Sequence, residues 1–143
     1  MRRALDLAAE AALAGEVPVG AVVTHGGDVV GEARNAMRGT FDPTAHAEIV
    51  ALRHAATRLG QARLDGCTLW VTLEPCAMCA AAIGLARIEK LVFAADDPKG
   101  GAVVNGPRLY GLPTCHHRPE VLGGIGEVEA AAQLRDFFAR RRG

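Results

Sequence analysis

Four residues in two short motifs have the types and spacing of a metal-dependent catalytic site. His46 and Glu48 stand in the triplet His-Ala-Glu, and Cys76 and Cys79 stand in the later run Pro-Cys-Ala-Met-Cys. Imidazole and thiolate are preferred zinc ligands, and three protein ligands leave the fourth tetrahedral position open for water. Glu48 is not needed as a ligand and is free to move protons. The spacing therefore predicts a hydrolytic zinc site with His46, Cys76 and Cys79 as ligands.

The charge of this ligand set suits hydrolysis. One neutral imidazole and two thiolates bring Zn²⁺ to a formal charge near zero, whereas four thiolates would bring it to about −2. The metal then remains a useful Lewis acid, so its bound water loses a proton near neutral pH instead of near about 15.7. We expect Glu48 to take that proton, pass it to the ring nitrogen beside the carbon under attack, and then protonate the departing amine.

The positions of these residues also predict how the chain must fold around them. On a regular helix, His46 and Glu48 would point about 200° apart, so they can serve one site only at the start of a helix. Cys76 and Cys79 follow a turn at Glu74-Pro75, which also precedes a helical run. We therefore expect two helix N-termini to face one metal, where their partial positive charge favours thiolate and hydroxide.

The surrounding elements follow from hydrophobic periodicity. Apolar residues at helical spacing predict helices over residues 2–14, 42–59, 76–86 and 127–142. β-rich runs predict strands over residues 18–24, 28–34, 68–73, 90–95 and 120–122. Asp42-Pro43 is expected to start the second helix, because Asp can cap and Pro suits the first helical position. The last helix is expected to turn five apolar residues to one side: Val128, Ala131, Leu134, Phe137 and Phe138.

Residues 96–118 break this pattern. Gly, Pro and Asn are frequent there, which predicts a long surface segment with at most one short helical turn. Segments of this length are often functional. The run Cys115-His116-His117 could be a second metal site, but we favour a surface loop. Elsewhere, alternating helices and strands predict an α/β fold with helices on both faces of a sheet.

Length and composition limit the classes of protein that remain. The 143 residues predict a single domain over residues 1–143. The 16 basic and 16 acidic side chains cancel, so any RNA binding must depend on local clusters such as residues 2–3 and 140–142. We see neither a signal peptide nor an apolar run of about 20 residues. We therefore expect a cytoplasmic protein that does not bind membranes, in which the paired cysteines bind metal or are redox-active and do not serve as structural disulfides.

Together these motifs resemble those of the bacterial tRNA-specific adenosine deaminases (the TadA family), within the cytidine deaminase-like superfamily. The resemblance covers nearly the whole chain and is carried by residues 16–22, 42–49, 72–79 and 136–138. It implies a three-layer α/β/α sandwich around a mixed five-stranded sheet, with one Zn²⁺ per subunit. It also implies that a homodimer hydrolyses the wobble adenosine to inosine in the anticodon loop of an arginine tRNA.

The resemblance also implies roles for further residues. Asn35 would hydrogen-bond the flipped base, Val17 and Pro18 would form walls of the pocket, and the backbone of Ala47 would meet the base. Other positions match family contacts with the anticodon stem-loop: Asp97, Lys99, Phe137, Phe138 and Arg141. The alternatives are a strand-end turn for Asn35 and core packing for the two phenylalanines.

Two other functions remain open from the sequence. A small-molecule deaminase that acts on guanine, cytosine or a free nucleoside shares the His-x-Glu and Pro-Cys-x-x-Cys core. A non-catalytic zinc-stabilised binding module would keep the three ligands but would have no need of Glu48. The stretches at residues 42–46, 71–76 and 136–142 favour the RNA enzyme, because a base held in single-stranded RNA needs apolar support and phosphate contacts.

Overall fold

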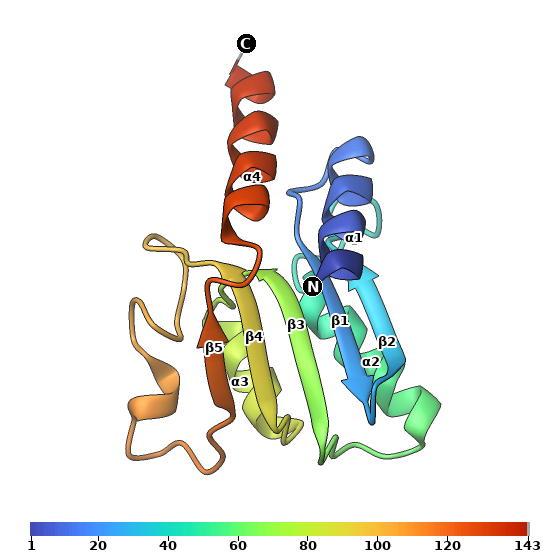
Figure 1. The fold of residues 1–143 in the computed structure, drawn as a ribbon, viewed down its shortest axis with the longest axis vertical. Helices are drawn as coiled ribbons and strands as arrows, with labels where there is room; N and C mark the ends of the chain where they lie inside the picture. The colour runs from blue at the N-terminus through green and yellow to red at the C-terminus, as the bar shows by residue number, and fades with distance from the viewer. Residues whose placement is uncertain (143) are drawn as a thin grey trace.

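A computed structural model describes residues 1–142 and shows a central sheet with helices on both faces (Figure 1). The strands are β1 (Gly20–His25), β2 (Asp28–Arg34), β3 (Cys67–Leu73), β4 (Lys90–Ala95) and β5 (Glu120–Gly123). The helices are α1 (Arg2–Leu13), α2 (Ala47–Leu59), α3 (Ala77–Leu85) and α4 (Glu127–Arg142), with a 3₁₀ turn η1 at Leu109–Gly111. α1 lies on one face of the sheet, and α2 and α3 lie on the other (Figure 1). The expected α/β fold is confirmed.

The strand order places the ends of β2 and β3 at one edge of the sheet. The order is β2-β1-β3-β4-β5, and the sheet is mixed, as the resemblance implied. β1 pairs antiparallel with both β2 and β3, so β2 and β3 run in the same direction. The start of β1 pairs with the ends of both neighbours, Gly20 with Arg34 and Ala21 with Val71. The helices that follow β2 and β3 therefore begin close together.

Small residues let α1 and α2 lie very close to the sheet. A Cβ atom at Gly20 would lie 2.0 Å from the carbonyl oxygen of Ala4 in α1. A Cβ atom at Gly31 would lie 2.5 Å from the carbonyl oxygen of Ala51 in α2. Ala4 and Ala51 are themselves fully buried. This close packing lets a chain with few aromatic residues exclude water from both faces of the sheet.

The predicted start of α2 was wrong. The helix begins at Ala47, and its first hydrogen bond runs from the amide of Val50 to the carbonyl of His46 at 3.1 Å. Asp42 does not cap the helix, because its carboxylate accepts hydrogen bonds from the amide and the hydroxyl of Thr44 at 2.9 and 2.7 Å. That local turn replaces the first helical turn, a competition typical of Asp. His46 consequently stands at the helix boundary.

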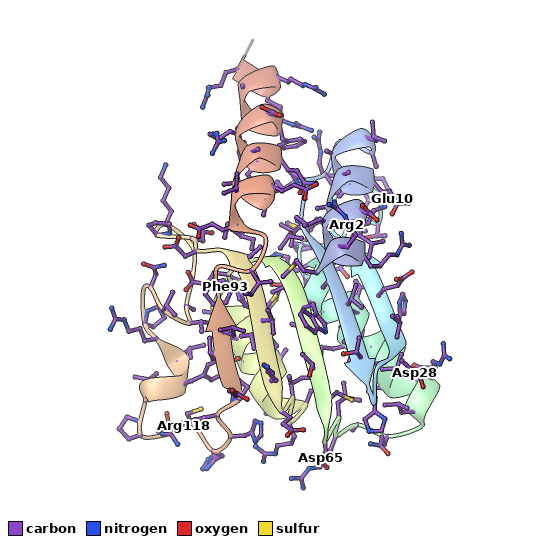
Figure 2. The ribbon with its side chains drawn as sticks, viewed as in Figure 1. Arg2, Glu10, Asp28, Asp65, Phe93 and Arg118 are labelled. Carbon is purple, nitrogen blue, oxygen red and sulfur yellow. The ribbon has the colours of Figure 1, made fainter. Side chains whose placement is uncertain are left out.

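The C-terminal helix α4 projects beyond the sheet beside α1 (Figure 1). It buries only Ala130 and Phe137, so the expected apolar side is partly wrong, and Val128 is 83% exposed. In the first turn Ala130 packs against Leu5, Ala94 and Ala95, and Val128, about 200° away around the helix, therefore faces away from that contact. Arg2, labelled in Figure 2, ties α1 to α4 through two hydrogen bonds of 2.8 Å to the Glu129 carboxylate.

Residues 96–118 carry one short 3₁₀ turn, η1, as the sequence predicted. Cys115 and His117 contact backbone carbonyls there: the Cys115 thiol donates to His117, and the His117 ring lies 2.7 Å from Ile88. Within residues 1–142, the metal-type cluster that the structure shows does not include them. No helix in this described range has the length and apolarity needed to cross a membrane.

Candidate active site

The N-termini of α2 and α3 meet at the candidate site, as the motif positions predicted. His46 immediately precedes α2 and has an extended backbone, with φ −70° and ψ 150°. Cys76 immediately precedes α3 and is also extended, with φ −72° and ψ 177°. Cys79 lies one turn into α3 and is fully buried. The side chains of both boundary residues are therefore released from the helical repeat and converge with Cys79 on one point.

His46, Cys76 and Cys79 have the geometry of a zinc ligand set. Their ligand atoms lie within 4.8 Å of one another, and no other such group occurs in residues 1–142. The Nδ1 atom of His46 is 3.6 Å from the Cys76 sulfur and 3.5 Å from the Cys79 sulfur. Tetrahedral zinc at usual bond lengths separates nitrogen and sulfur ligands by about 3.5 Å. The donor set and its spacing therefore fit zinc.

The protonation of the ligands also favours a cation at this point. The Cys79 thiol and then His46 hydrogen-bond to Cys76, which lowers the pKa of the Cys76 thiol to about 4. The same contact with Cys76 raises the pKa of His46. The hydrogen bond with Cys76 and burial raise the pKa of the Cys79 thiol. A metal cation at this point would favour the thiolate form of both cysteines, since zinc binds cysteine as thiolate.

Glu48 lies against the ligand set in the first turn of α2. It is buried, with 4% of its surface exposed, and burial raises the pKa of its carboxyl to about 7. A hydrogen bond from its own backbone amide, the charge of His46 and, last, a hydrogen bond with the Cys79 thiol oppose this shift. A carboxyl group with a pKa near neutrality can both accept and donate a proton at physiological pH. The structure thus brings all four motif residues to one place.

Asn35 joins the elements around the site. Its side-chain oxygen accepts a 2.9 Å hydrogen bond from the amide of Ala47, and its side-chain nitrogen donates at 3.1 Å to the carbonyl of Val17. The second N–H of its amide group remains available for another partner. Val17 is half-buried and Pro18 is fully buried in the same junction. Asn35 therefore fixes the end of β2 against the start of α2.

Comparison with known proteins identifies the family. A family model for MafB19-like deaminases matches residues 1–142. The chain belongs to the MafB19-like deaminase family. Its match covers every element that builds the site, from α1 to α4. Together with the His-Cys-Cys centre, this membership confirms the prediction of a deaminating hydrolase over that of a non-catalytic zinc module.

Individual relatives of the deaminase are similar along nearly its whole length. The tRNA-specific adenosine deaminase of Agrobacterium fabrum (strain C58) is 51% identical over 99% of this chain and 93% of that protein. A structure solved in work on A-to-I editing by tRNA:A34 deaminases at the wobble position has a TM-score of 0.92 at 51% identity, covering 94% of this chain and 97% of that one. The resemblance to tRNA-specific adenosine deaminases is therefore confirmed.

A guanine deaminase from Bacillus subtilis shares the same fold. Its TM-score is 0.65 at 43% identity, over 66% of the present deaminase and 61% of the other chain. The shared part shows that one scaffold serves related deaminations.

The residues expected to touch RNA differ in exposure in this deaminase. The carboxylate of Asp97 accepts 3.1 Å hydrogen bonds from the amides of Lys99 and Gly100, while the Lys99 side chain is exposed. On α4, Phe137 is buried and Phe138 is 44% exposed. The two rings meet edge to face with centroids 5.3 Å apart.

Arg141 is held between α4 and the end of α1. Its guanidinium lies 4.5 Å from the centre of the Phe137 ring and donates a 2.6 Å hydrogen bond to the carbonyl of Gly15. A cation above an aromatic face is attractive, so this contact orients the guanidinium. Phe137 is thus buried, as the core-packing alternative requires, with Arg141 stacked upon it.

Two buried glutamates that organise loops near the site were not found from the sequence. Glu74, at the end of β3, accepts hydrogen bonds from the amides of Asp97, Val103, Val104 and Asn105 and from the Asn105 side chain, at 2.7 to 3.0 Å. Glu16 accepts from the amides of Arg38 and Gly39 at 3.1 and 2.9 Å. The sequence does contain a signal for both residues. Each glutamate lies near one end of a buried strand and close to a proline, Glu74 before Pro75 and Glu16 before Pro18.

Proposed function

We propose that this deaminase converts the wobble adenosine in the anticodon loop of an arginine tRNA to inosine, with release of ammonia. One observation carries the proposal. The His46, Cys76 and Cys79 cluster, with Glu48 beside it, lies in a chain that is 51% identical to a tRNA-specific adenosine deaminase and aligns with 93% of its length. Similarity over the full length includes α4 and residues 96–118, which lie outside the catalytic core. Acting on tRNA would put the enzyme in the cytoplasm.

His46, Cys76 and Cys79 would hold one zinc ion per subunit. Their nitrogen-to-sulfur distances of 3.5 and 3.6 Å support this assignment. When bound, zinc supplies the Lewis acidity that brings the pKa of a water ligand close to neutrality. The N-termini of α2 and α3 add partial positive charge at the same point, which stabilises thiolate ligands.

Glu48 is the proton shuttle in this proposal. Its carboxylate takes a proton from the attacking water and delivers it to the ring nitrogen next to the carbon under attack. The carboxylate then takes the second proton of that water, from the new hydroxyl group, and gives it to the amine that leaves, so that the hydroxyl becomes a carbonyl and ammonia departs. Support comes from its position, buried in the first turn of α2 and in contact with Cys79.

The base would be bound at the junction that Asn35 organises. We assign its remaining N–H to the purine, Val17 and Pro18 to the walls of the pocket, and the backbone of Ala47 to a contact with the base. The two hydrogen bonds of Asn35, to Ala47 and Val17, hold its side chain in a single orientation. A preorganised donor loses little entropy when the base arrives.

The anticodon loop would lie across residues 97–99 and the C-terminal part of α4. Lys99 and Phe138 offer exposed side chains, whereas Asp97 and Phe137 position their neighbours. Arg141 carries positive charge at a fixed place beside α1. RNA loops are recognised by such combinations of cationic and aromatic groups.

We also propose a homodimer. A groove of about 280 Å³ runs between α3 and η1, and its lining includes Leu85 and Leu112, which are 79% and 39% exposed. Exposed apolar side chains gathered at one groove are typical of protein interfaces. Light scattering on wild type and on Leu85→Glu tests this proposal, which requires a dimer for the first protein and a monomer for the second.

The direct test is inosine formation on an arginine-tRNA anticodon stem-loop, beside free adenosine, guanine and cytidine under the same conditions. The proposal requires inosine at the wobble position and a steep loss of affinity as salt increases. Turnover of a free base or nucleoside with an untouched stem-loop would instead assign the chain to the small-molecule deaminases.

A further inference from the structure

Phe41 is a large apolar side chain that the packing of the molecule does not explain. It is 93% exposed, the highest value among the large hydrophobic residues of the described chain. Its φ of 53° lies in the left-handed region, which is unfavourable for a bulky L residue. Strained, exposed residues of this kind concentrate at sites of function. The exposure and the backbone conformation of Phe41 therefore indicate a role in binding another molecule.

The turn that carries Phe41 is held rigidly. Within residues 36–45, the amide of Ala36 donates to the carbonyl of Ala45 at 3.1 Å, and the amide of Asp42 donates to Met37 at 3.0 Å. The buried carboxylate of Glu16 accepts hydrogen bonds from the amides of Arg38 and Gly39, two residues before the ring. The aromatic ring is therefore presented to solvent from a preorganised turn.

The turn lies between two parts of the site. The Ala36–Ala45 hydrogen bond closes it directly between Asn35, at the base-binding junction, and His46, a zinc ligand. The segment that joins β2 to α2 also passes next to the end of α1 (Figure 1). There the carbonyl of Gly15 accepts hydrogen bonds from Arg38 at 3.5 Å and from Arg141 of α4 at 2.6 Å.

The charge around the turn suits a nucleic acid. Arg38 and Arg141 meet at Gly15, and Arg53 is close enough to Asp42 to lower the pKa of its carboxyl, after the larger effect of the Thr44 hydrogen bonds. Unpaired bases of RNA stack on aromatic side chains, and neighbouring cations bind the phosphates. An enzyme that draws one base into its pocket also unstacks the neighbours of that base.

We infer that Phe41 is a stacking platform for an unpaired nucleobase adjacent to the base that is deaminated. This inference rests on the proposed function and adds a residue to it. Phe41 replaces the stacking that the neighbouring base loses, and Glu16 acts as a positioning residue that keeps the turn in place. Substrate affinity should therefore depend on the ring, while the chemical step should not.

The test is steady-state kinetics on the stem-loop with Phe41→Ala, Phe41→Trp and a control, Val128→Ala. Phe41→Ala removes the ring on which the base stacks, so it should raise KM about tenfold or more with kcat nearly unchanged. Phe41→Trp keeps an aromatic ring and should retain the wild-type KM. Val128 is a suitable control because it is 83% exposed on α4 and has no assigned role. An unchanged KM for Phe41→Ala would overturn the inference.

Two further readouts identify the occupant. In the first, an abasic site replaces the nucleotide on one side or the other of the target adenosine. At one of these two positions the abasic substrate should give the same KM with Phe41→Ala as with wild type. If Phe41→Ala still raises KM with both abasic substrates, the inference is overturned. A change from dimer to monomer in Phe41→Ala, seen by light scattering, would instead assign the ring to a second copy of the chain. Wild type that fails on the stem-loop refutes the proposed function, whereas active wild type with an indifferent Phe41→Ala refutes only this inference.

Discussion

Two buried glutamates near the same edge of the sheet, Glu48 at the metal centre and Glu74 under residues 97–105, have opposite electrostatics. Their exposed fractions are 4% and 2%. Burial raises the pKa of Glu48 to about 7. Burial acts in the same direction on Glu74, but hydrogen bonds from Asp97, Asn105 and the amides between them hold the pKa of that carboxyl below its usual range.

The difference lies in the donors that surround each carboxylate. Glu74 receives five hydrogen bonds from residues 97–105, which fix it as an anion and make it the anchor of that segment. Donors of this kind stabilise the charged form, whereas desolvation favours the neutral form. Glu48 is controlled by desolvation, so its proton is easily gained and lost. Two carboxyl groups with similarly small exposed fractions therefore differ in protonation, because desolvation dominates at Glu48 and hydrogen-bond donors dominate at Glu74.

Removal of a zinc ligand should break the catalytic region most completely. Cys79→Ala should lose zinc, lower activity by about a thousandfold or more and destabilise the domain, because the metal provides both Lewis acidity and cross-linking. Zinc per subunit is measured by elemental analysis. Cys67→Ala is a matched control, since Cys67 is equally buried and lies at the far end of β3. Unchanged zinc content in Cys79→Ala would contradict the ligand assignment.

Glu48→Gln should remove the proton shuttle without removing the metal. We expect kcat to fall by roughly 10²- to 10⁴-fold, a range typical of general acid–base residues, with zinc content and melting temperature close to wild type. Glu120→Gln, at an exposed position on β5, is the control. Substantial activity in Glu48→Gln would show that another group moves the protons.

Glu74→Gln should damage stability more than chemistry, which sharpens the comparison with Glu48. An amide cannot accept all five hydrogen bonds, and its own N–H groups would face the amides of Val103 and Val104. We expect a loss of about 2–4 kcal/mol in the free energy of unfolding, measured with urea, and faster amide exchange over residues 97–105. The Glu120→Gln control should change neither quantity. Stability equal to wild type would contradict the anchoring role.

Gly101→Ala should produce a smaller disturbance in the same region. A Cβ atom there would lie 2.4 Å from the Glu74 carboxyl carbon and 2.6 Å from the carbonyl oxygen of Asp97, so one of them must move. Overpacking of this kind costs about 1–3 kcal/mol. Gly111→Ala is the matched control, because a Cβ atom at Gly111 meets nothing within 4 Å. Equal melting temperatures for the two variants would refute the tight fit around Glu74.

The sequence predicted the elements of this protein well where side-chain periodicity was strong. The strands predicted over residues 28–34 and 90–95 have the observed bounds. It failed where one residue type has two local uses: Asp42 can cap a helix or bond to its own turn, and Thr44 decided in favour of the turn. It failed again at Val128, because packing against α1 and the sheet selected Ala130, which lies about 200° away around α4.

The sequence by itself predicted His46, Cys76 and Cys79, which the structure brings together in a cluster that fits zinc. Histidine, cysteine and glutamate carry their chemistry in their side chains, and short motifs at the ends of strands gather them reliably. Only the tertiary structure showed that Glu74 is a buried anchor of residues 97–105, and only it placed Phe41 in solvent. The physical reason is that burial and hydrogen-bond donors come from distant parts of the chain: Glu74 binds Asn105, 31 positions away.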